Sequence, residues 1–151
     1  MKKTVFKVAA LLFTGIGTTA CGSSKQTAQA VGLTGEWNIV KVNGDTVNAA
    51  NAPFIGLDMA DKRVYGNAGC NRMTGSFEAD SLHPGKIQFG QIGTTRMMCP
   101  DMETERKILD ALGKVTSFSA NADETVSLLD ESGTEVLTLT RNAGTPLSEA
   151  Q

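Results

Sequence analysis

The sequence contains little histidine and no excess of positive charge. Its single histidine, His83, excludes a metal site built from several imidazoles and leaves one candidate for a catalytic imidazole. Because 14 Lys and Arg residues stand against 16 Asp and Glu residues, the formal charge is −2 and the pI is near 5.4. A chain of this kind has no basic surface for a phosphate backbone, so we expect no nucleic acid among its partners.

The first 20 residues have the pattern of a secretory signal peptide. Three lysines precede an apolar run over residues 8–16, which is about half of the ~20 residues that a membrane-spanning helix needs. The following TTACG segment, residues 18–22, resembles a lipobox, in which the cysteine thiol is acylated and becomes the new N-terminus. We therefore expect Cys21 to carry a lipid anchor to a membrane. The alternative is a secreted protein cleaved near Ala20.

Cleavage after residue 20 removes three lysines and leaves 11 basic against 16 acidic residues, a net charge of −5. The polar and small residues that follow are typical of a flexible tether, and the C-terminal end lacks an apolar pattern. We divide the chain into a signal peptide (1–20), a tether (21–32), one domain (33–140) and a frayed tail (141–151).

Within the domain, short segments of alternating apolar and polar residues are separated by turns rich in Gly, Pro and Asn. In Trp37–Val42 the alternation places Trp37, Ile39 and Lys41 on one face. The segments at residues 75–79 and 86–92 have the same character, and the pattern as a whole predicts about seven short strands. We expect an α+β fold, in which one helix closes a strand-rich antiparallel sheet or incomplete barrel.

The one segment of helical character is Pro100–Leu112, which has no run of β-branched residues. Pro100 suits the first helical position, and Gly113 is placed as the C′ residue after the helix. We expect an apolar stripe of Met98, Met102, Ile108, Leu109 and Leu112, and a solvated charged face of Asp101, Glu103, Glu105, Arg106 and Lys107.

With Cys21 assigned to lipidation, Cys70 and Cys99 have one possible pairing in an oxidising compartment. A disulfide between them is the first interpretation, and two inert, reduced thiols are the second. The third is redox chemistry at Cys99, because Arg96 and the start of the helix would lower its thiol pKa.

The other chemistry-bearing residues indicate no active site. His83 lies in a turn and is expected to be a solvated loop residue. Met97, Met98 and Met102 are expected to fill the core rather than bind a soft metal, and no acids stand at a recognised metal-ligand spacing. The sequence also lacks a nucleophile elbow, a phosphate loop and a dinucleotide fingerprint. We therefore expect no enzymatic activity, no cofactor and no metal.

Three stretches together resemble the META/HslJ family of bacterial envelope proteins. They are LTGEW at residues 33–37, followed by Asn43-Gly44; GCNR at 69–72, followed by Gly75 and Phe77; and TTRMMCP at 94–100. The resemblance implies a small, strand-rich α+β domain, and it covers residues 33–140. The matching positions, which serve either the fold or binding, are Gly69, Cys70, Asn71, Thr95, Arg96, Met98 and Cys99.

The resemblance implies the cellular conditions in which the protein acts, but no reaction. Members of the family are linked to heat-shock induction and, in some cases, to resistance to an antibiotic such as novobiocin, with no catalytic mechanism attached. We therefore expect a non-enzymatic lipoprotein, anchored through Cys21 in the outer membrane and facing the periplasm or the surface, with a stress-related interaction role. One alternative is a binding or inhibitor module that acts on a basic protein, since the mature charge is negative. The other alternative is a thiol-redox protein that uses Cys99.

Overall fold

The computed structural model describes residues 30–142, except 49, 51, 81 and 122. The expected signal peptide, Cys21 and most of the expected tether and tail lie outside the described residues. The first described element is a 3-10 turn, η1 (Ala30–Leu33), so the last residues of the expected tether already belong to the folded domain. Leu33 is buried, and its carbonyl oxygen accepts a hydrogen bond from Trp37 Nε1 over 2.8 Å.

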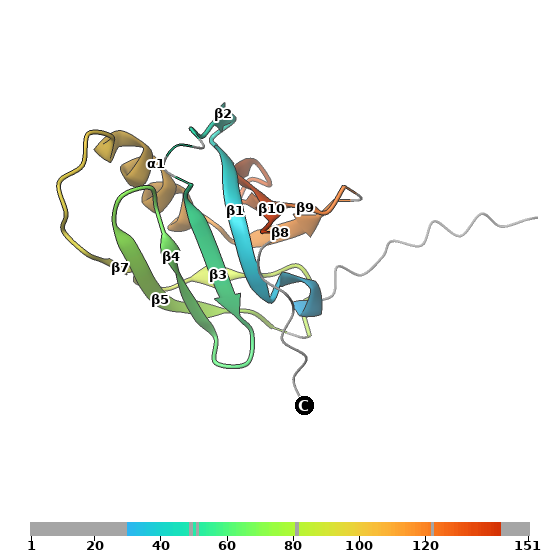
Figure 1. Cartoon of the computed structure of the whole chain (residues 1–151). Coiled ribbons are helices and arrows are strands. Elements are labelled where there is room, and N and C mark those ends of the chain that lie inside the picture. The colour runs from blue at the N-terminus through green and yellow to red at the C-terminus, as the bar shows by residue number, and fades with distance from the viewer. Residues whose placement is uncertain (1–29, 49, 51, 81, 122, 143–151) are drawn as a thin grey trace, which may run out of the picture.

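The described part of the chain contains ten antiparallel strands and one helix (Figure 1). Paired neighbours follow the order β6-β5-β4-β3-β1-β10-β9-β8, while β7 also pairs with β5 and β2 pairs with β1. The strands are β1 (Gly35–Val42), β2 (Asp45–Thr46), β3 (Phe54–Asp58), β4 (Arg63–Asn67), β5 (Arg72–Glu78), β6 (Gln88–Phe89), β7 (Gly93–Thr94), β8 (Ser117–Ala120), β9 (Thr125–Leu129) and β10 (Glu135–Arg141).

The two ends of this sheet come together and form a nearly closed barrel. Lys86, just before β6, forms a bridge with Ser117 in β8, and the Phe118 N–H donates to the Gly85 carbonyl over 2.8 Å. Every strand of four or more residues contributes buried apolar side chains to one core. The expected α+β fold, a strand-rich antiparallel sheet or incomplete barrel with one helix, is confirmed.

Two details of the strands differ from the sequence prediction. The predicted strand at 86–92 is reduced to Gln88–Phe89, and Gly93–Thr94 forms a separate short strand after it. The chain between the two runs close to β5, since a Cβ at Gly75 would lie 2.9 Å from the Gln91 carbonyl oxygen. In β1 the pairing register with β10 shifts between Ile39 and Lys41. This irregularity interrupts the alternation, so Lys41 is exposed and Val42 is buried instead.

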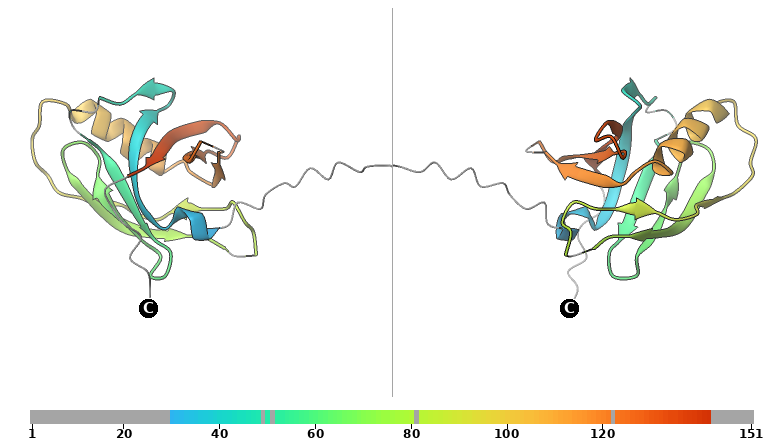
Figure 2. Two further views of the ribbon diagram at one scale, coloured as in Figure 1. Left: turned by 45° about the vertical axis from the view of Figure 1, so that its right-hand side comes forward. Right: turned by 180° about the vertical axis from the view of Figure 1, so that it is seen from behind.

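Helix α1 (Met102–Leu112) packs against β1 and β10 (Figure 2). It begins two residues later than predicted, because Asp101 is the N-cap: its carboxylate accepts from the Thr104 N–H over 3.1 Å and from the Thr104 hydroxyl over 2.8 Å. These bonds hold the pKa of Asp101 below its ordinary value. Gly113 is the C-cap, with φ of −66°, so its expected place as the C′ residue is wrong by one position.

Candidate functional site

The residues of the family signature meet where the turn between β4 and β5 approaches the start of α1. At its centre is Asn71, which is 1% exposed and uses its whole amide group. Its Nδ2 donates to Glu105 Oε1 and Oε2 over 3.0 and 3.1 Å and to the Met97 carbonyl over 3.2 Å. Its Oδ1 accepts from the Thr95 hydroxyl over 2.8 Å and from the Met97 N–H over 2.7 Å. One side chain therefore holds both the helix and the segment that leads to it.

Glu105 is the partner that the sequence analysis placed wrongly. We expected it on the solvated face of the helix, but it is only 5% exposed. Its Oε2 also accepts the backbone N–H of Asn71 over 2.9 Å, so three donor contacts from one residue satisfy the buried carboxylate. Glu103 and Lys107 do lie toward solvent and form an ion pair over 3.1 Å. The sequence does contain a pattern that indicates burial of Glu105: it is spaced i, i+3, i+7 with Ile108 and Leu112, which places all three on one face of the helix.

A disulfide joins the two cysteines beside this network. Cys70 and Cys99 are bonded, with their Cα atoms 6.1 Å apart. This is the first of the three interpretations of the pair, and it engages the sulfur that a redox role for Cys99 would use. Closing the 29-residue separation stabilises the fold by roughly 3–4 kcal/mol in the chain-entropy account. The disulfide and Asn71 together fix the segment 95–99, which we call the clasped loop.

The clasped loop is fixed in its backbone but open in its side chains. Thr95 is tied to β5 through two contacts with Arg72: its N–H donates to the Arg72 carbonyl over 3.1 Å, and its hydroxyl accepts from the Arg72 N–H over 3.2 Å. Arg96 is exposed, Met97 is 58% exposed and Met98 is 93% exposed. Neither methionine belongs to the core, so the expectation that Met97 and Met98 fill it is wrong, as is the place of Met98 on the helical stripe; Met102 is half-buried on α1. The helical period does not extend back through Pro100 and Asp101, which are not helical.

The tight turn of the signature has its own local support. Gly69 has φ of +119°, a conformation that favours glycine, and its N–H donates to Asn67 Oδ1 over 2.6 Å. The Ala68 N–H donates to the Asn71 carbonyl over 3.1 Å and closes the turn. Gly69, Cys70, Asn71, Thr95, Arg96, Met98 and Cys99 are therefore brought together, whereas Cys21 lies outside the described residues.

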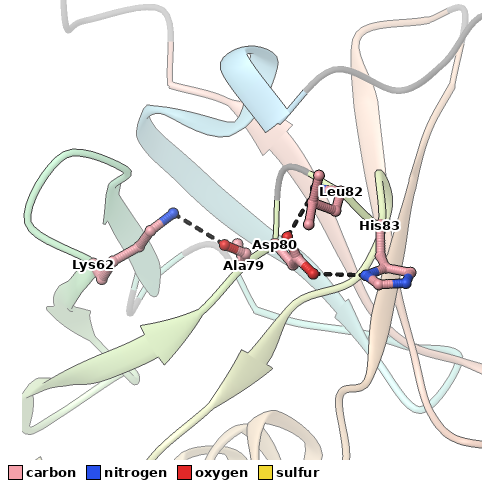
Figure 3. Close-up of polar contacts among 5 residues, drawn as sticks. All are labelled: Lys62, Ala79, Asp80, Leu82 and His83. Carbon is pink, nitrogen blue, oxygen red and sulfur yellow. Dashed lines mark hydrogen bonds and ion pairs between the residues drawn. The ribbon is translucent and has the colours of Figure 1, made fainter.

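A second polar cluster lies at the turn after β5, next to a hollow of about 820 Å³ (Figure 3). His83 Nδ1 lies 2.6 Å from Asp80 Oδ2, and the Leu82 N–H donates to Asp80 Oδ1 over 2.8 Å. The contact with His83 is the main cause that holds the pKa of Asp80 below its ordinary value. Lys62 Nζ donates to the Ala79 carbonyl over 3.2 Å. His83 is exposed in a loop, as expected, and its polar partner is an acid three residues before it.

The described residues contain neither a metal-binding cluster nor a membrane-spanning helix. No group of three or more His, Cys, Asp and Glu side chains there is close enough to hold a metal ion. Across the same part of the chain, no helix is long and apolar enough to cross a membrane.

Comparisons with known proteins identify relatives of the whole domain. The family described as META domain matches residues 29–143. Among curated proteins, none matches the chain significantly. An NMR structure of a protein from Burkholderia xenovorans is 25% identical, with a TM-score of 0.59, and covers 77% of this chain and 87% of its own. A crystal structure of a DUF4847 family protein from Bacteroides vulgatus is 15% identical, with a TM-score of 0.55 and coverage of 74% and 95%, and this likeness shows the fold alone.

Proposed function

The chain belongs to the META domain family, and from that premise we propose a non-enzymatic lipoprotein of the cell envelope that acts through a protein partner. The acylated Cys21 would hold it in the outer membrane, facing the periplasm or the surface. The clasped loop would bind the partner, and the process served would be a stress response or tolerance of envelope-active drugs.

The exposure of Met97 and Met98 on a fixed backbone is the observation that carries this proposal. Apolar side chains that are 58% and 93% exposed favour burial against another surface. Methionine adapts its shape to the partner that it meets, so it is common at binding surfaces. The disulfide and Asn71 already restrict the backbone, so binding there would lose little further conformational entropy.

The position of the loop agrees with a tethered protein. The clasped loop and η1 lie on opposite sides of the domain in all views (Figures 1 and 2). A tether from Cys21 would enter the domain at η1, so the loop would face away from the anchoring membrane. Met97 and Met98 would then meet a partner rather than the lipid of their own leaflet.

Anchoring is tested by intact-protein mass spectrometry on material taken from membranes. We expect loss of residues 1–20, an added acyl mass on Cys21, and alkylation of Cys70 and Cys99 only after reduction. An unacylated chain in the soluble fraction contradicts the lipoprotein proposal. Ready alkylation of both cysteines without reductant would instead favour the alternative of a thiol-redox protein. The phenotype of Cys99→Ser would then test that alternative.

Partner binding is tested with a photocrosslinking residue placed at Met98 in intact cells. Leu82 provides a matched control, because it is an apolar side chain, 83% exposed, in a different loop. We expect a discrete protein adduct from position 98 and none of the same mass from position 82. Equal adducts from both positions, or none from 98, contradict the proposed contact. Steep salt dependence of the adduct would favour the alternative of a basic partner.

The biological role needs a separate experiment. A deletion strain complemented with Met97→Ser/Met98→Ser should resemble the deletion under heat and envelope-active drugs, whereas complementation with Leu82→Ser should restore the wild-type response. A deletion strain that is indifferent to both stresses contradicts the stress role.

A further inference from the structure

A groove of about 740 Å³ lies on the outer face of the barrel, beside the clasped loop. Its walls come from β3, β4, β5 and β7, which neighbour one another in the sheet. Phe54, Tyr65 and Gly66 are among the residues on one side, and Arg72, Thr74 and Thr94 are among those on the other. The groove therefore combines aromatic surface with hydroxyl groups and one cation.

The aromatic ring of Tyr65 is laid flat by the glycine beneath it. A Cβ at Gly56 would lie 2.2 to 2.6 Å from the Tyr65 ring atoms Cζ, Cε2 and Cε1, so one ring face rests on the Gly56 backbone. The hydroxyl reaches across the strand and donates to Glu36 Oε1 over 3.4 Å. Burial first, and then the negative charge of Glu36, raise the pKa of Tyr65, which keeps the phenol neutral. Because Tyr65 is 42% exposed, its other ring face is open for stacking.

Gly66, which also lines the groove, allows β4 to lie close to the backbone of β3. At this position φ is +152°, and a Cβ would lie 2.2 Å from the Phe54 carbonyl oxygen. No larger residue fits there without displacing β3. Phe54 pairs with Asn67, and Asn67 pairs with Arg72, so the second aromatic side chain and the cation lie in one row across the sheet.

Charge determines what the groove would accept. Arg72 is the one charged residue among those that line it, and the lining includes no acid. Within the described chain, the Arg72 side chain has no carboxylate within 4.0 Å, while its backbone is fixed by Thr95. A guanidinium is a planar donor that matches a carboxylate or phosphate group. On a domain with an overall negative charge, this groove is a local positive site.

We propose that this groove binds a small molecule that carries an apolar, planar ring and one anionic group. The ring stacks on Tyr65 and contacts Phe54, and the carboxylate or phosphate pairs with Arg72, while the hydroxyls of Thr74 and Thr94 supply further hydrogen bonds. The site depends on neither lipidation nor a partner at the clasped loop, so its test is independent of the tests of the proposed function.

The test is titration of the full-length, 15N-labelled protein, followed by backbone amide shifts in NMR spectra. The probes are 2-naphthoate, 2-naphthyl phosphate, neutral 2-naphthamide and acetate. We expect saturable shifts at Tyr65, Gly66, Arg72 and Thr74 with either aromatic anion, and weaker binding of the amide and of acetate. Binding of only one aromatic anion identifies which anionic group the site accepts.

The variant Arg72→Met should weaken binding of the aromatic anion about tenfold, the effect of losing one charge-assisted pair. Arg63→Met is the matched control, because Arg63 is exposed on the same sheet and does not line the groove. It should leave the affinity unchanged. Tyr65→Leu should weaken all aromatic probes alike. Equal losses in the two arginine variants, shifts that map to another surface, or no saturation in the millimolar range would overturn the proposal.

Discussion

Asn71 donates its side-chain amide to both carboxylate oxygens of Glu105, which lies 34 residues further along the chain. This contact joins the turn between β4 and β5 to the first part of α1. Both side chains are buried, so removal of either one would leave buried polar groups of the other without hydrogen-bond partners.

Removal of the Asn71 side chain should destabilise the domain strongly. In Asn71→Ala, Glu105 keeps only the backbone N–H of residue 71, and the Met97 N–H loses its acceptor. We expect the free energy of unfolding to fall by about 2–4 kcal/mol. Urea titration followed by circular dichroism measures it. Asn121→Ala, at an exposed site, should cost less than about 1 kcal/mol, and equal losses in the two variants would contradict the role given to Asn71.

The stability of the domain should depend on the carboxylate group of Glu105 and not only on the volume of its side chain. Glu105→Gln retains the shape but turns one acceptor into a donor against the two donor groups of Asn71. We expect a loss of about 1–3 kcal/mol in the free energy of unfolding. Glu103→Gln is the control from the same helix, and its exposed carboxylate should contribute less than about 0.5 kcal/mol. If both variants unfold alike, the buried contact is not a stabilising one.

Loss of the disulfide should weaken the domain without releasing the whole clasped loop. We expect Cys70→Ser/Cys99→Ser to lower the free energy of unfolding by roughly 3–4 kcal/mol. In the same variant, the Met97 amide should stay protected from hydrogen exchange in the native state, since its N–H donates to Asn71 Oδ1. The wild type in reductant should reproduce the variant. A Met97 amide that exchanges freely in the folded variant would show that the disulfide alone holds the loop.

Acid should remove a stabilising contribution from Glu135, the first residue of β10. Hydrogen bonds from Ser127 and Thr138 hold the pKa of Glu135 below its ordinary value of 4.5, with a smaller contribution from Lys41. The unfolded chain therefore binds the proton more readily. The contribution to stability is present above about pH 4.5 and is lost as the pH falls through the lower, folded-state pKa. Urea unfolding of wild type and Glu135→Gln should differ at pH 7 and converge in acid. A constant difference across the pH range would contradict this.

The sequence predicts the fold class because strand alternation and helical spacing are local patterns. It also restricts Cys70 and Cys99 to one pairing. It does not predict the burial of Glu105. A carboxylate beside exposed charged residues is expected to be solvated, and only the distant partner Asn71 changes that expectation. The register shift between Ile39 and Lys41 is likewise set by pairing with β10, not by β1 itself.

The exposure of Met98 and the outer groove could not be predicted for a related reason. Met98 fits the helical spacing of Met102 only if the helix continues backwards, and the N-cap at Asp101 ends it. The groove requires Arg72, Asn67 and Phe54 to lie in one row, which depends on the pairing of three strands. Alternation assigns a residue to a face, but it does not assign its neighbours.

The anchoring of the clasped loop also determines how it meets proteases. Met97 is hydrogen-bonded to Asn71 through both its N–H and its carbonyl, and Cys99 is covalently bonded to Cys70. Met98 is the one residue between these two attachments, although it is the most exposed of the large apolar side chains described. Proteolytic cleavage requires several consecutive residues to extend into an active-site cleft, and here the backbone cannot do so without local unfolding. The loop thus keeps its side chains exposed while its peptide bonds stay protected from cleavage.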